Sequence, residues 1–172
     1  MAYNFRMSNL ERLPVVDQTT VREFVVNKRS PILSLIDDID QRYPVLGNVI
    51  TAEFTRYGED VLRPLLFGAL ITAVLLEQAQ KKVGGILPEQ VSEEAVYAAL
   101  FSVLDNTDGE VKIMENQFRE DQKELFSGLE YFSNNIVKKD HALCTAGGQI
   151  TLFAFTHILE AQVLAKKLGF KG

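Results

Sequence analysis

Apolar residues gather in one stretch near the middle of the chain, residues 65–76, where ten of the twelve positions are strongly apolar. Only Gly68 and Thr72 interrupt this stretch, and it has no polar face at either the helical or the strand period. A helix that is apolar on every side is buried on every side. The pattern therefore predicts a central helix over about residues 60–83, which ends at Gly84 and is surrounded by the other helices.

Amphipathic segments flank this stretch on both sides. Their apolar residues recur every three or four positions, as in helices, and no segment alternates at period two for long enough to predict a strand. The predicted helices cover about residues 20–29, 31–43, 46–57, 92–104, 111–136 and 149–168. The sequence therefore predicts an all-α fold, a single-domain helical bundle of six to seven helices over residues 19–172, with a weakly ordered N-terminal segment at residues 1–18.

Local signals mark the ends of several helices. Thr20 and Glu23 have the spacing of a capping box, and Ser92 is a suitable N-cap residue. Gln122 is the single polar member of the apolar stripe in the 111–136 helix, and we expect it at the edge of the stripe, partly exposed. Residues 134–148 carry a polar run and a glycine pair, which predict a loop before the last helix.

Charge and cysteine content narrow the choice of partners. The net charge is −5, from 18 basic and 23 acidic residues. This balance disfavours a nucleic-acid surface, where clustered Lys and Arg neutralise phosphates, and it disfavours docking on anionic lipid. The central apolar stretch is shorter than the roughly 20 residues that a membrane-spanning helix needs. The single cysteine, Cys144, forms no internal disulfide, so we expect a cytoplasmic protein without nucleic-acid or membrane partners.

A polar loop over residues 104–115 resembles the calcium loops that join two helices. Asn106, Asp108 and Glu115 occupy positions three, five and twelve of that pattern, which supply oxygen ligands. Position one is Leu104, whose side chain has no oxygen. A polar turn that ends one helix and begins the next explains the same residues. Asn106, Asp108 and Glu115 are therefore weak candidates for a divalent cation, and we expect no other cofactor.

Four glutamates are candidates for carboxylate chemistry, namely Glu53, Glu77, Glu115 and Glu160. Glu53 and Glu77 adjoin apolar positions, and burial there would raise their pKa values. Their spacing does not show whether any two of them converge. His157 lies three residues before Glu160, on the same side of a helix, but a chain with two histidines lacks the ligands of a di-iron bundle.

Two further groups have a simpler structural explanation. Asp37, Asp38 and Asp40 surround Ile39, which is typical of the solvated face of a helix rather than of a magnesium site. Cys144 follows His141 by three residues, but a single cysteine before an apolar helix is more often a small buried hydrophobic residue than a nucleophile.

Three classes of function remain open at this point. The first is a non-catalytic helical interaction or regulatory module that acts through self-association or a protein partner; the absence of a catalytic motif and the abundance of apolar helix surface favour it. The second is a bundle that binds a small apolar ligand between the central and last helices, near Phe67, Gly68, Ala69, Ala73, Phe153, Ala154 and Phe155. The third is a metal- or carboxylate-dependent enzyme. We expect the first.

Overall fold

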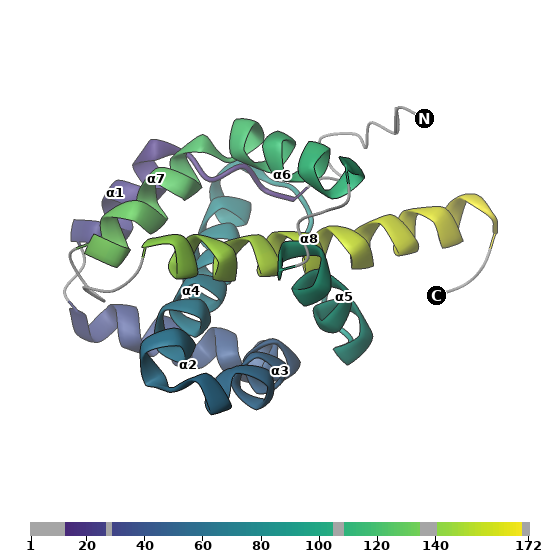
Figure 1. Cartoon of the computed structure of the whole chain (residues 1–172). Helices are drawn as coiled ribbons and strands as arrows, with labels where there is room; N and C mark the ends of the chain where they lie inside the picture. Colours follow the sequence, from purple (N-terminus) through teal and green to yellow (C-terminus); the bar gives the residue numbers. More distant parts are fainter. Residues whose placement is uncertain (1–12, 27–28, 105–108, 135–140, 170–172) are drawn as a thin grey trace.

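The computed structural model describes residues 13–26, 29–104, 109–134 and 141–169. These residues form eight α-helices and one short 3-10 helix, with no β-strand among them, so the chain is all-α as the sequence predicts (Figure 1). The elements are α1 (Gln18–Val26), α2 (Arg29–Arg42), α3 (Pro44–Phe54), η1 (Thr55–Tyr57), α4 (Glu59–Val83), α5 (Glu93–Leu104), α6 (Gly109–Asp121), α7 (Lys123–Phe132) and α8 (His141–Lys167).

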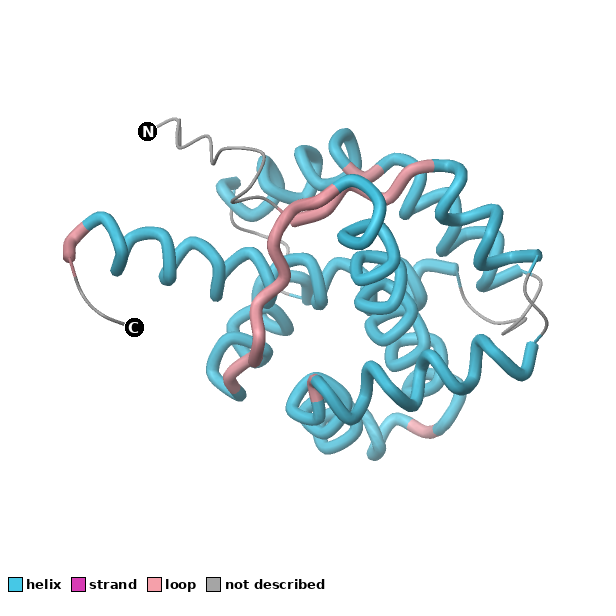
Figure 2. The backbone as a smooth tube through the Cα atoms, turned by 180° about the vertical axis from the view of Figure 1, so that it is seen from behind, coloured by secondary structure: helices cyan, strands magenta, loops and turns pink. Residues whose placement is uncertain are grey.

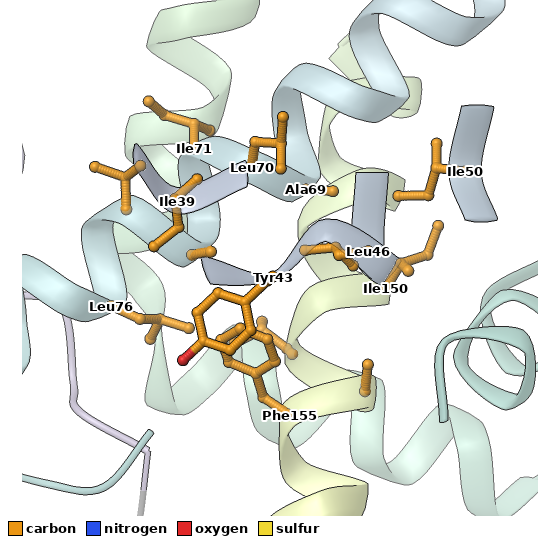
Figure 3. Packing of buried hydrophobic residues seen from close by; sticks show 14 of the residues in the cluster. Ile39, Tyr43, Leu46, Ile50, Ala69, Leu70, Ile71, Leu76, Ile150 and Phe155 are labelled. Atoms are coloured by element: carbon orange, nitrogen blue, oxygen red, sulfur yellow. The ribbon is translucent and has the colours of Figure 1, made fainter. Parts of the chain in front are cut away.

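Helices α4 and α8 make the most extensive contact of any two elements. They cross steeply rather than run side by side (Figure 1). Every residue from 68 to 76 of α4 is buried, as the apolar stretch predicts, and α4 also contacts α1, α2, α3 and α7. Tyr43 lies between α2 and α3, and the centre of its ring is 4.9 Å from that of Phe155 on α8. Ile39 and Leu46 belong to the same buried cluster (Figure 3).

Glycines allow α4 and α8 to approach with their backbones in contact. A Cβ atom on Gly68 would lie 1.9 Å from the carbonyl oxygen of Cys144, and one on Gly147 would lie 2.0 Å from that of Leu65. Gly147 thus lies inside a helix and not in a loop. The sequence-based prediction of a loop up to residue 148 is wrong over residues 141–148, because these residues form the first two turns of α8. Glycine costs about 1 kcal/mol in a helix interior, and the close helix contact offsets that cost.

The predicted helix 111–136 is divided into α6 and α7 at Gln122, which raises the number of helices above the expected six or seven. Gln122 is only 4% exposed, so the expectation of a partly exposed edge position is wrong. Its Oε1 accepts a hydrogen bond from the Val16 N–H at 3.0 Å, and its Nε2 donates one to the Pro14 carbonyl at 2.8 Å. The amide thus holds the segment before α1, where Val16 is buried. Residues 1–12 lie outside the described residues.

Capping agrees with the sequence at one helix and differs at another. Ser92 Oγ accepts a hydrogen bond from the Ala95 N–H at 3.1 Å, as expected for an N-cap. At α1 the cap is Asp17 and not Thr20, because Asp17 Oδ1 accepts hydrogen bonds from both the N–H and the hydroxyl of Thr20, each at 2.7 Å. These hydrogen bonds lower the pKa of Asp17. Glu23, free of the predicted capping role, forms an ion pair with Lys82 of α4.

The C-terminal part of α8 extends beyond the other helices (Figures 1 and 2). Leu159 is the last buried residue of this helix. Leu164 is 58% exposed, and Leu168, which follows the helix, is 62% exposed. By length and composition alone α8 is long and apolar enough to cross a membrane, but 72% of its most apolar 18 residues are buried inside the fold, as in a core helix. We call residues 160–168 the α8 tail.

Candidate interaction surface

The candidate cation loop is only partly covered by the described residues. Asn106 and Asp108 lie outside them. Glu115 lies on α6, where its Oε1 accepts a hydrogen bond from Gln149 Nε2 of α8 at 2.8 Å and lies 3.7 Å from Arg119 Nη2. Gln149 is buried, so this contact joins α6 to α8. Among the residues with described positions, no group of three or more His, Cys, Asp or Glu side chains could hold a metal ion.

The four candidate glutamates lie on four different helices and contact four different partners. Glu77 of α4 pairs with Arg42 at 2.6 Å, and Glu115 binds Gln149 as described above. Glu53 of α3 is hydrogen-bonded to Tyr97; burial, together with this carboxylate, raises the pKa of the Tyr97 hydroxyl. Burial raises the pKa of Glu160 on α8, and neighbouring His157 partly opposes that shift. Glu53, Glu77 and Glu115 thus each bind a side chain of another helix, and none of the three shares its partner with another candidate.

Cys144 is buried, with its Sγ 3.8 Å from the Leu129 carbonyl oxygen. Burial raises the pKa of its thiol to about 12, so the sulfur is protonated at neutral pH. His141 does not face this thiol as a base; its Nδ1 lies 3.4 Å from Ser133 Oγ. The thiolate, which is the nucleophilic form, is therefore scarce, and the interpretation of Cys144 as a buried hydrophobic residue is confirmed.

The three aromatic residues proposed to line a ligand pocket have separate ring partners. Phe155 packs on Tyr43, Phe153 lies with its ring 5.0 Å from that of Phe118, and Phe67 lies 6.4 Å from Phe132. The small residues of the same group, Gly68, Ala69, Ala73 and Ala154, are all buried. In α2, Asp37, Asp38 and Asp40 are exposed around the fully buried Ile39, as expected for a solvated helix face.

The α8 tail carries two of the exposed large apolar side chains of the described chain, Leu164 and Leu168. Positions 157, 161, 164 and 168 follow one another at steps of four, three and four, which places His157, Ala161, Leu164 and Leu168 on one side of the helix. We call these four residues the seam. All four are exposed, whereas Ile150 and Ala154, which continue the same spacing toward the N-terminus of α8, are completely buried. One apolar stripe thus begins in the core and ends in solvent.

The two flanks of the seam differ in chemistry. Helical geometry places Ile158 and Ala165 on one flank and Glu160 and Lys167 on the other. Along the apolar flank runs a shallow groove of about 370 Å³ between α8 and the segment before α5. Its lining residues are Gln90, Val91, Ser92, Ile158, Ala161, Gln162 and Ala165. The seam therefore has a small-residue groove on one side and a pair of opposite charges on the other.

The sequence predicts an apolar stripe along the last helix, which we expect to pack against the central helix, but it does not predict which part of the stripe is exposed. Nothing in the period of the stripe marks where it leaves the body, because Leu164 and Leu168 continue the spacing of the buried residues without interruption. Comparison with known proteins gives no independent guide: the chain matches no protein-family model, and the searches of curated proteins and of solved structures found no significant match.

Proposed function

We propose that this protein is a non-catalytic helical module that acts by self-association and that the α8 tail is its contact surface. The observation that carries the proposal is the exposure of Leu164 and Leu168, at 58% and 62%, on a helix that extends beyond the body. Contiguous apolar surface of this kind on a helix is typical of an association site. The helices of the body supply the rigid base from which the tail extends.

The exposed leucines of the tail supply part of the apolar area that association requires. Leu164 and Leu168 together expose roughly 240 Å², and removing that area from water is worth about 6 kcal/mol at about 25 cal/mol per Å². Phe101, Leu104 and Ile113 are also more than half exposed, on α5 and α6, which both pack against α8. These three side chains lie outside the tail, and the two leucines alone supply only part of the roughly 800 Å² that each partner buries in a standard interface.

The candidate catalytic groups support a non-catalytic role. Three of the four glutamates bind side chains of other helices, Glu160 is influenced by neighbouring His157, and the thiol of Cys144 is buried and protonated. General acid–base catalysis requires groups that reach a common substrate atom, and nucleophilic catalysis requires an accessible activated group. The described arrangement of these side chains favours structural roles for them, whereas the leucines of the tail have no structural role within one chain.

Sedimentation equilibrium tests the proposal through the mass of the protein in solution. We expect a mass of twice the 19.3 kDa of one chain at concentrations between about 1 and 200 μM, the range in which an interface of this size associates. Leu164→Glu combined with Leu168→Glu places charge on the seam and should give a single-chain mass over the same range. Circular dichroism should show an unchanged helix content, because neither leucine is buried within the chain.

Val83→Glu is the matched control. Val83 is 57% exposed, as much as Leu164, but it is the last residue of α4 and not part of the tail. This variant should keep the mass of the wild-type protein. A wild-type chain that has single-chain mass at every concentration would overturn the proposal, and so would a dimer that the two leucine substitutions leave intact.

A further inference from the structure

We infer that the two copies pair through their α8 tails in antiparallel orientation, so that Glu160 of each copy lies beside Lys167 of the other. This inference rests on the proposed self-association and adds its geometry. It follows from the seam, from the unlike chemistry of its two flanks and from the position of the tail relative to the body.

The seam has the spacing of a two-helix coiled coil. Steps of four, three and four residues keep one side of a helix facing a partner helix. When two such seams run antiparallel, Leu164 of one copy lies opposite Ala161 of the other, and Leu168 lies opposite His157. Leu164 thus meets a small side chain, which lets the two helices approach closely, and Leu168 packs on the imidazole of His157 at the end of the overlap.

The flanks decide between the two orientations. In a parallel pair, each flank meets the opposite flank of the partner, so Glu160 of one copy would face Ala165 of the other. A carboxylate would then lose water without gaining a charged partner, which is costly. In an antiparallel pair, like flanks meet: Glu160 faces Lys167 of the second copy, and this ion pair occurs twice because the arrangement is symmetric.

The apolar flank agrees with the same orientation. Ile158 and Ala165 of one copy would face the same residues of the other, and the partner helix would cover the groove that begins at Val91. The position of the tail agrees as well. The tail, residues 160–168, extends past the other helices over about 12 Å at about 1.5 Å per residue. Antiparallel pairing overlaps two such tails and places the two bodies at opposite ends of the overlap.

Cysteine cross-linking distinguishes the two orientations. The chain offers a clean background, since Cys144 is its single cysteine and is completely buried. The variants are His157→Cys and Leu168→Cys, prepared separately with tags of different mass and oxidised mildly, alone and after mixing. A disulfide requires the two Cα atoms to lie within about 7 Å. In the antiparallel pair position 157 faces position 168, whereas two copies of position 168 are about 16 Å apart along the axis.

We therefore expect a disulfide-linked pair of unlike tags in the mixture, and no cross-link from either variant alone or from the wild type. A cross-link from Leu168→Cys alone indicates parallel pairing and overturns the inference. A dimer by mass with no cross-link in the mixture also overturns it. Both of these results leave the proposed self-association intact, whereas a wild-type monomer in sedimentation overturns the proposed function itself.

Charge reversal gives a second, independent test. Glu160→Lys and Lys167→Glu each place like charges together twice per dimer, and each should weaken the dimer about tenfold at low salt. The double variant, Glu160→Lys with Lys167→Glu, restores unlike pairs only if the two positions face each other, and it should recover the wild-type dissociation constant within about threefold. A double variant as weak as the single variants would overturn the inference.

Discussion

Replacing Gly147 by alanine tests the contact between α4 and α8 that organises the fold. The added Cβ would lie 2.0 Å from the Leu65 carbonyl oxygen and 2.9 Å from the Ala69 nitrogen. Both atoms belong to the backbone of α4, so no side-chain rotation can relieve the overlap. The two helices must move apart by about 1 Å to restore even the closest contact that Cβ atoms make, and that movement loosens the packing of the buried residues around the crossing.

The expected loss of stability follows from two opposing effects. Alanine is a better helix former than glycine, which alone would stabilise the fold by about 1 kcal/mol. Overpacking of a core costs about 1–3 kcal/mol where side chains can adjust, and the cost here lies at or above the upper end because the backbone must shift. We expect the free energy of unfolding to fall by about 2 kcal/mol or more.

Urea unfolding followed by circular dichroism measures this loss. For a slope of about 2 kcal/mol per molar urea, the midpoint should fall by about 1 M. Gly109→Ala is the matched control, because Gly109 is the first residue of α6 and nothing lies within 4 Å of a Cβ atom built there. It should leave the midpoint unchanged or raise it slightly. If Gly147→Ala unfolds at the wild-type midpoint, the close backbone contact between α4 and α8 does not exist in solution.

Three further predictions test other contacts. Gln122→Ala leaves the buried Val16 N–H and the Pro14 carbonyl without their partner, and should lower the free energy of unfolding by about 2–4 kcal/mol in the same urea assay. Asp17→Ala removes the cap of α1 and should cost about 1 kcal/mol at pH 7. Because folding lowers the pKa of Asp17 below 3.8, the cap stabilises the fold above that pH and loses its effect as the pH falls further, so wild type and Asp17→Ala should converge in stability toward pH 2. Cys144 should react with a thiol reagent at pH 8 only as fast as the protein opens, because the thiol is buried and its pKa is about 12; reaction at the rate of a free thiol would contradict this position.

The sequence predicts the all-α class and the burial of the central stretch because both depend on local pattern. Residues 65–76 are apolar on every side, and a helix of this kind is stable only when it is buried, whichever elements cover it. Ser92 was identified as an N-cap for the same reason, since its partner, the Ala95 N–H, lies three residues away. Interactions between residues close together in the chain can be predicted from the local sequence.

The features that the sequence did not predict depend on contacts between distant residues. Gln122 divides a helix because its amide binds Pro14 and Val16, more than 100 residues earlier in the chain. Gly147 reads as a loop residue from its local surroundings, but the partner that makes a glycine necessary inside α8 is the carbonyl of Leu65. In each case the local preference is outweighed by one tertiary contact, and a single sequence carries no signal of that contact.

The same limit explains why the sequence did not predict which part of α8 is exposed. From Ile150 to Leu168 the stripe of α8 keeps one spacing. The spacing therefore does not distinguish the residues that are buried from those that are exposed. The body covers this stripe as far as Ala154, and the four residues of the seam are exposed. A second tail in antiparallel orientation would bury the remaining leucines with the same type of helix-to-helix contact, and would also neutralise Glu160 with Lys167. Burial within the chain explains the first half of the stripe, and the proposed pairing with a second chain would explain the rest.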